Sequence, residues 1–169
     1  MFKKLLYLLI IFYASLEGKT MKFTSPAFSH NGSIPSQYTC DGANVSPALQ
    51  WSNEPEGTKS FALIVDDPDA PAKVWVHWVV FNIPNTVRSL AEGASTSDFT
   101  QGATDFNGKQ GYGGPCPPSG THHYQFTLYA LDTMLPDLPA GAIKEQLIKA
   151  MEGHIIGQTT LIGTYQRKK

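Results

Sequence analysis

The chain has 169 residues, 41% of them hydrophobic and 16% charged, which suits one domain with a core of its own. Its 13 basic and 14 acidic residues leave a net charge of -1, which excludes a protein built to neutralise a nucleic acid backbone. Two cysteines are too few for a disulfide-built scaffold, and no Cys/His spacing indicates a structural zinc site. With 15 glycines and 12 prolines, a turn-rich, β-dominated globule remains.

The N-terminus has the layout of a secretory signal peptide. Lys3 and Lys4 precede an uncharged apolar run, Leu5 to Tyr13, which is too short to span a bilayer. We therefore expect residues 1–18 to be a leader, with no membrane span once it is removed. Residues 19–169 are then a single domain that is periplasmic or secreted.

The cellular compartment also bears on the two cysteines. An exported domain could form a disulfide between Cys40 and Cys116, although the sequence does not show how close they are. Leu16 occupies a position that is small in most cleavage sites, and translation from Met21 would give a cytoplasmic domain without a leader. Both locations stay open, and export is the favoured one.

Beyond the leader, the pattern of apolar residues predicts mainly strands. Residues 61–65 form an unbroken apolar run, and residues 74–83 are β-branched and aromatic. Strict alternation over residues 124–131 predicts a strand with Tyr124 on its apolar face, and an Ile/Thr/Leu-rich strand is expected over residues 154–165. Turn-forming residues dominate residues 19–58 and 85–120.

One helix is predicted near the C-terminus. Ile143, Leu147 and Met151 recur at a spacing of four, which puts them on one face of a helix. Pro139 can occupy the first turn, and Gly153 can end the helix. The expected fold class is mainly β: an antiparallel β-sandwich with this principal helix and short peripheral helical turns.

The first candidate site is an Asp-Pro loop behind the 61–65 strand. Asp67 and Asp69 flank a proline there, and Pro71 follows, so the carboxylates leave the strand in fixed directions. The plainer interpretation is a turn with solvated acids. The spacing does not match a calcium loop, which needs alternating acids, a central glycine and a distal glutamate.

The second candidate is His77, inside the apolar 74–83 strand. Alternation places it on the face shared by Trp75, Val79 and Phe81. Taken by itself, a histidine on an apolar strand face is more often a hydrogen-bonded core residue than a ligand group.

The third candidate is a loop rich in glycine and proline. Gly114 and Pro115 begin a rigid segment that delivers His122 and Tyr124 to one side of the next strand, and His123 to the other. Backbone N–H groups and an imidazole can together form a small anion cradle. The plainer interpretation is a proline-rich corner whose side chains cap the core.

Two other chemistries draw on the same residues. A hydrolase would use Cys116 or Ser119 as nucleophile, with His122 as base and Asp67 to orient it. Against it, Cys116 lies between prolines and no nucleophile-elbow motif is present. A metal site is chemically allowed, although alternation scatters the two adjacent histidines. Its ligands would be Asp67, Asp69, His77 and His122.

Three motifs occur in an order that is typical of one known family. They are Asp67-Pro68-Asp69-Ala70-Pro71, His77 followed by an apolar strand, and Gly114-Pro115-Cys116-Pro117-Pro118 leading into His122-His123-Tyr124. Together they resemble the phosphatidylethanolamine-binding protein family, and more narrowly its bacterial Raf-kinase-inhibitor-like branch. The segments Tyr38 to Pro47 and Leu161 to Tyr165 also fit, so the resemblance covers about residues 21–166.

The resemblance implies a β-sandwich with a pocket at one end that binds phosphate-like anions. It reverses the core interpretation of His77, because that residue now has partners. The family usually has arginine where this chain has His123, which faces outward. The pocket residues it implies are Asp67, Asp69, His77, Gly114, Pro115, His122 and Tyr124.

The function implied by the resemblance is binding without catalysis. The expected ligand is a small anion, a phosphorylated ligand or a phospholipid head group. Regulation or inhibition of a kinase or protease and self-association as a homodimer are implied as well. No cofactor and no nucleic acid partner are expected.

Overall fold

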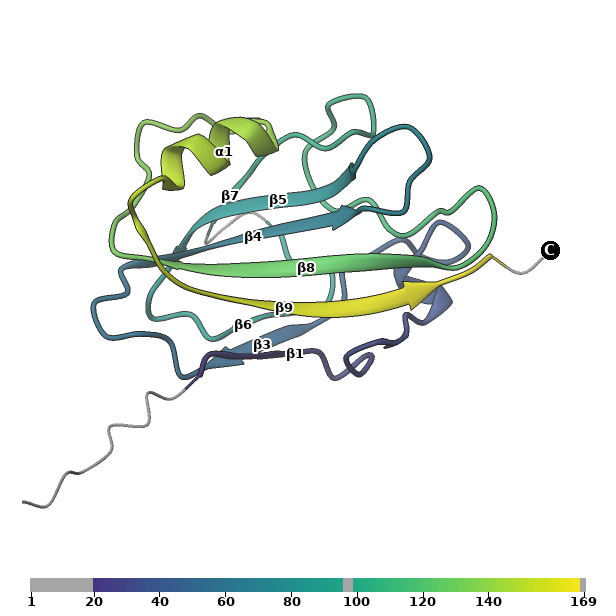
Figure 1. Cartoon of the computed structure of the whole chain (residues 1–169), viewed down its shortest axis with the longest axis horizontal. Coiled ribbons are helices and arrows are strands. Elements are labelled where there is room, and N and C mark those ends of the chain that lie inside the picture. Colours follow the sequence, from purple (N-terminus) through teal and green to yellow (C-terminus); the bar gives the residue numbers. More distant parts are fainter. Residues whose placement is uncertain (1–19, 96–98, 168–169) are drawn as a thin grey trace, which may run out of the picture.

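Two layers of strands build the molecule (Figure 1), whose computed structural model describes residues 20–95 and 99–167. The predicted leader lies outside these residues. The smaller sheet has the strand order β1-β3-β6, and the larger has the order β2-β9-β8-β4-β5-β7. The smaller sheet consists of β1 (Lys22–Thr24), β3 (Leu49–Ser52) and β6 (Ser89–Leu90). The larger sheet consists of β2 (Gly32–Ser33), β4 (Ser60–Asp67), β5 (Trp75–Pro84), β7 (Thr100–Gln101), β8 (His122–Leu131) and β9 (Ile155–Tyr165).

The predicted fold class, a mainly β sandwich, is confirmed. Among the described residues every strand pair is antiparallel except β2 with β9, which run parallel. The predicted strands correspond to β4, β5, β8 and β9. A 3-10 turn at Ser36–Tyr38 lies in the segment between β2 and β3.

Strand β4 is buried on both faces, which explains its unbroken apolar sequence. Phe61, Leu63 and Val65 pack into the core between the two sheets. Ala62 and Ile64 face the other way and pack against the helix side of the larger sheet. A strand covered on both faces has no reason to alternate with polar residues.

The principal helix, α1 (Lys144–Met151), begins later than predicted. Pro139 belongs to a turn closed by the Ala142 N–H, and Gly141 adopts a positive φ of 80°, so the helix starts only after both. The expectation that Ile143 shares a helix face with Leu147 and Met151 is wrong, because it precedes the helix and is 48% exposed. Its N–H donates to the side chain of Gln146, which caps the first turn.

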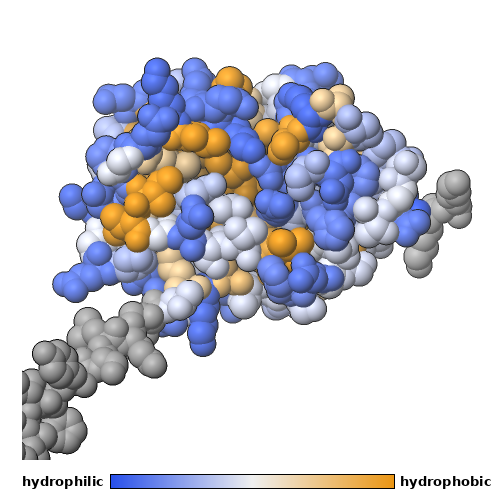
Figure 2. Space-filling view, in the orientation of Figure 1, coloured by the Kyte–Doolittle hydropathy of each residue, from blue (hydrophilic) through white to orange (hydrophobic). Residues whose placement is uncertain are grey.

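Leu147 and Met151 carry the packing of α1, since both are fully buried against the larger sheet. Burial of each such side chain contributes about 1.5–3 kcal/mol. Figure 2 shows hydrophobic residues reaching the surface around the helix and the start of β9. The largest of them are Met134, Ile143, Ile148, Ile155 and Ile156. Scattered exposure of this kind is ordinary for a folded surface. None of the helices in residues 20–95 and 99–167 has the length and apolarity to cross a membrane.

Candidate functional site

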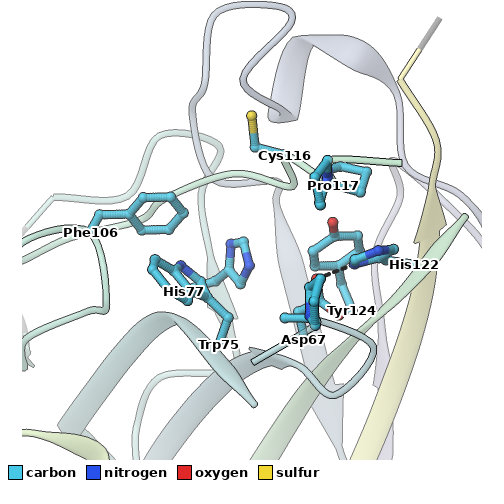
Figure 3. A pocket seen from close by; sticks show the side chains of 11 residues that line it. Asp67, Trp75, His77, Phe106, Cys116, Pro117, His122 and Tyr124 are labelled. Carbon is cyan, nitrogen blue, oxygen red and sulfur yellow. Dashed lines mark hydrogen bonds and ion pairs between the residues drawn. The ribbon is translucent and has the colours of Figure 1, made fainter. Parts of the chain in front are cut away.

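A cavity of about 330 Å3 lies at the end of the sandwich where β4 ends and β5 and β8 begin (Figure 3). The loop after β4 and the glycine- and proline-rich loop before β8 form its rim. Residues from all three candidate motifs therefore meet here. The lining residues are Asp67, Ala70, Pro71, Trp75, His77, Phe106, Cys116, Pro117, Pro118, His122 and Tyr124.

A buried pair of side chains, His122 and Asp67, joins β8 to the end of β4. Nδ1 of His122 lies 2.7 Å from Oδ2 of Asp67, and the two side chains are only 8% and 5% exposed. The other carboxylate oxygen of Asp67 accepts the backbone N–H of Asp69 at 2.9 Å. Both oxygens of Asp67 are thus engaged, and among the described residues Nε2 of His122 has no hydrogen-bond partner.

A bulge in β5 turns His77 into the cavity. The pairing with β4 runs from Trp78 directly to Val76, so that His77 is the extra residue. Its ring packs against Tyr124 at 5.1 Å between ring centroids. The expectation that His77 shares a face with Val79 and Phe81 is wrong, because those two pack on the helix side of the sheet. Simple alternation cannot foresee an inserted residue.

The tautomer of His77 follows from its hydrogen bond to Gly113. Nδ1 lies 2.6 Å from the carbonyl oxygen of Gly113, which can only accept, so Nδ1 carries the proton and Nε2 faces the cavity. Burial lowers the pKa of His77 below its usual 6.5, and this effect exceeds the opposing ones of the Gly113 and Gly114 backbone and of the Asp66 and Asp67 carboxylates. The ring is therefore neutral at pH 7 when the cavity holds no anion.

The hydroxyl of Tyr124 is buried and makes no hydrogen bond within the described residues. The hydroxyl points into the cavity beside His122 (Figure 3). Burial, reinforced by the nearby Asp67 carboxylate, raises the pKa of Tyr124 far above its usual value, so the phenol keeps its proton. A buried donor without a partner costs about 1–3 kcal/mol, and a ligand that accepts from it would recover that cost.

Three residues implied by the resemblance do not line the cavity. The carboxylate of Asp69 is 42% exposed and accepts from both Nδ1 and the backbone N–H of His123, each at 2.8 Å. Gly114 and Pro115 lie behind the wall, where Pro115 accepts the N–H of Cys40 at 3.1 Å. Both residues belong to the loop that forms the rim, but they are outside the cavity lining.

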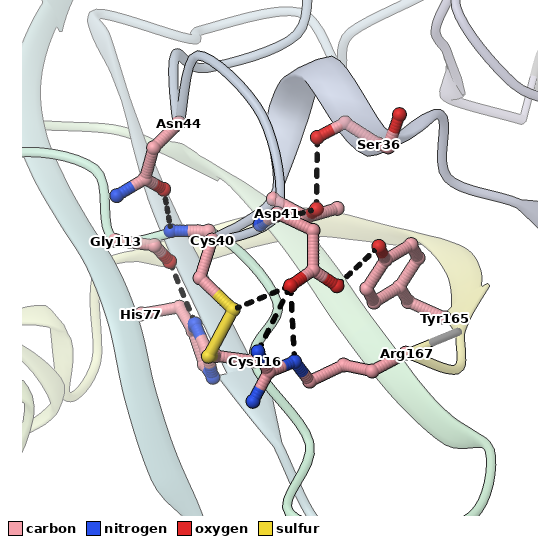
Figure 4. Close-up of a disulfide and its surroundings, with 11 residues drawn as sticks. Ser36, Cys40, Asp41, Asn44, His77, Gly113, Cys116, Tyr165 and Arg167 are labelled. Carbon is pink, nitrogen blue, oxygen red and sulfur yellow. Dashed lines mark hydrogen bonds and ion pairs between the residues drawn. A yellow bond between two sulfur atoms is a disulfide. The ribbon is translucent and has the colours of Figure 1, made fainter. Parts of the chain in front are cut away.

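A disulfide joins Cys40 to Cys116 beside the cavity, with a Cα–Cα distance of 5.4 Å (Figure 4). Cys116 is thus not a free thiol, and the hydrolase alternative is wrong in using it as nucleophile. Ser119, the other candidate nucleophile, is exposed and is not among the residues that line the cavity. Within residues 20–95 and 99–167, no three His, Cys, Asp or Glu side chains are grouped to hold a metal ion.

The apolar walls of the cavity were not among the predicted site residues. Trp75 and Phe106 pack edge to face at 5.8 Å between centroids, and Phe106 also contacts the ring of His77 at 5.2 Å. The signal for Trp75 was its position two residues before His77 in the same strand. Phe106 lies in a stretch without periodicity, so only the fold brings it to the site.

Comparison with known proteins gives consistent matches over almost the whole described chain. The sequence model of the family described as phosphatidylethanolamine-binding protein matches residues 24–166. A relative from Methanothermobacter thermautotrophicus, named UPF0098 protein, is 54% identical over 87% of this chain and 99% of its own.

Two solved structures share the fold. The phosphatidylethanolamine-binding protein homologue CT736 from Chlamydia trachomatis has a TM-score of 0.83 and 45% identity, covering 88% of this chain and 99% of its own. Escherichia coli YbcL, described as a member of the mammalian PEBP family, has a TM-score of 0.82 and 34% identity over 89% of this chain and 100% of its own. The chain belongs to the phosphatidylethanolamine-binding protein family.

Proposed function

We propose that this protein binds a phosphate-like anion in the cavity and catalyses no reaction on it. Inorganic phosphate, a phosphorylated small molecule and a phospholipid head group share the required chemistry. The observation that carries the proposal is the buried Tyr124 hydroxyl, a donor with no partner in the described residues, aimed into a cavity with two imidazoles. A non-bridging phosphate oxygen is an acceptor that would satisfy it.

The binding should be linked to protons. Both histidines use Nδ1–H for protein partners, so each can donate to an anion through Nε2 only after taking up a second proton. With neutral rings, the Asp67 carboxylate would repel the anion. Protonation of His77 places a cation beside the Asp67 carboxylate and offsets its charge, and affinity for an anion should therefore rise as the pH falls.

The double variant His77→Asn and His122→Asn tests the proposal. An asparagine amide keeps a donor close to the position of Nδ1 but removes the ring nitrogen that faces the cavity. Calorimetric titration with inorganic phosphate should show binding to the wild type and none to the double variant. The matched control is His154→Asn, which alters an exposed His–Asp pair with a 2.8 Å contact at the other end of β8. Unchanged affinity in the double variant would sink the proposal.

The proposed location is the periplasm or the exterior of the cell. The Cys40–Cys116 disulfide supports it, because cytosolic reductants keep most thiols reduced. N-terminal sequencing of the natural protein should find the leader removed. A start at Met21 with reduced cysteines would instead favour the cytoplasm.

Two further parts of the proposal rest on the family resemblance alone. They are the regulation or inhibition of a kinase or protease, and assembly as a homodimer.

A further inference from the structure

The peptide between Gly113 and Gly114 is held from both sides. Its carbonyl oxygen accepts the proton on Nδ1 of His77 at 2.6 Å, and its N–H donates to Oδ1 of Asn44 at 2.7 Å (Figure 4). The two contacts thus lie on opposite edges of one rigid plane. The orientation of this plane decides whether His77 meets an acceptor or a donor.

A peptide between two glycines is the kind that most easily turns over, because neither neighbour has a Cβ to oppose the change in backbone angles. Both glycines are required by packing. A Cβ at Gly113 would overlap the ring of Phe106, and one at Gly114 would overlap the carbonyl oxygen of Tyr38. The chain therefore cannot stiffen this peptide with a larger residue, and something outside it must fix the orientation.

We propose that Asn44 is a positioning residue that fixes this peptide and thereby the tautomer of His77. The inference rests on the proposed function for its link to binding, but the tautomer can be observed without a ligand. If the peptide turned over, the Gly114 N–H would donate to Nδ1, and the neutral ring would carry its proton on Nε2. Asn44 prevents this by giving the N–H an acceptor on the far side.

Asn44 is itself well anchored, although its side chain is at the surface. Its backbone N–H donates to the carbonyl of Gln37 at 2.9 Å, and its φ of 56° is in the left-handed region that asparagine tolerates. The disulfide at Cys40 ties the same segment to the loop that carries Gly114. Gly114 is buried, so that its N–H depends on this one side chain for an acceptor.

The consequence for binding lies in the proton balance. With Nδ1–H fixed, His77 contacts an anion only after taking up a proton on Nε2. With the peptide free to turn, the neutral Nε2–H tautomer could donate directly, and no proton would be needed. The other titratable groups facing His77 are Asp66 and Asp67 from β4 and Tyr124 from β8. A substitution at Asn44 alters none of these three groups.

The test is a set of variants followed by nitrogen-15 NMR of the histidine rings. Asn44→Gly removes the amide and keeps the positive φ without strain, whereas Asn44→Asp keeps both the acceptor and the tolerance of that φ. Asn53→Gly is the matched control, because Asn53 has a similar φ of 61° and its side chain makes no contact with the cavity loops. In the wild type, Asn44→Asp and Asn53→Gly, His77 should show the proton on Nδ1.

In Asn44→Gly the ring signals of His77 should move toward the Nε2–H form. Sulfate, which keeps its charge over this pH range, should then bind with less pH dependence. The slope of log affinity against pH between pH 8 and 6 should be smaller by about one than in the wild type. Unchanged ring signals in a folded Asn44→Gly protein would overturn the inference. It would also be overturned if the ring signals of His77 shifted in Asn44→Asp as they do in Asn44→Gly. If the wild type bound neither sulfate nor phosphate, the proposed function would fall while the ring signals would still decide the role of Asn44.

Discussion

Two adjacent histidines make the same contact in opposite surroundings. Nδ1 of His122 lies 2.7 Å from the carboxylate of Asp67, and Nδ1 of His123 lies 2.8 Å from that of Asp69. The first pair is almost fully buried, whereas the side chains of the second are 54% and 42% exposed. Strand alternation sends one ring into the cavity and the other into solvent. A His–Asp contact is therefore a candidate site only where water is kept away from it.

Replacement of the two carboxylates should give the largest difference between the pairs, measured as a loss of stability. Asp67→Ala leaves the buried His122 imidazole without an acceptor and also removes the acceptor of the Asp69 N–H, and we expect a loss of about 3–5 kcal/mol in the free energy of unfolding. Asp69→Ala acts at the surface, where water replaces the lost acceptor, and should cost less than about 1 kcal/mol. Urea denaturation measures both, and equal losses would show that burial does not distinguish the pairs.

Replacement of the two histidines should change the affinity for phosphate to different extents. His122→Asn removes the Nε2 that faces the cavity, and the loss of one charge-assisted hydrogen bond should weaken phosphate binding by about 10- to 100-fold. His123→Asn removes an outward ring and should change the affinity by less than about twofold. Calorimetry at pH 6 compares them. A comparable loss in His123→Asn would place the ligand on the rim instead of in the cavity.

Acidification should remove the small contribution of the exposed His123–Asp69 pair to stability, and this is the smallest of the expected effects. The hydrogen bond from the His123 side chain, assisted by the backbone N–H, lowers the pKa of Asp69 below its usual 3.8. Because the folded pKa is the lower one, this contact adds stability above about pH 4, and the gain is lost as the pH falls through the folded value.

The stability of Asp69→Ala should therefore approach that of the wild type between pH 5 and 2.5, as measured by urea denaturation at each pH. The gap should be well under 1 kcal/mol at its largest, since solvent screens the pair. A gap that widens on acidification would contradict the assignment.

The sequence determined the elements in which local periodicity is strong. Alternation in β8 placed Tyr124 on the apolar face, and the unbroken apolar run of β4 indicated a buried strand. The order of the three motifs along the chain was enough to indicate the family. These features depend on neighbours a few residues apart, which is the range over which a pattern of apolar residues carries information.

The assembly of the site depends on contacts between residues that are far apart in the sequence. The bulge at His77 depends on its register with β4, and the start of α1 depends on a turn that packs against β7. Asp67 lines the cavity while Asp69 does not, although the two are separated by one residue. Asn44 reaches Gly114 across 70 residues. Such contacts are set by how strands pair and loops close over long sequence distances, and no local pattern encodes that geometry.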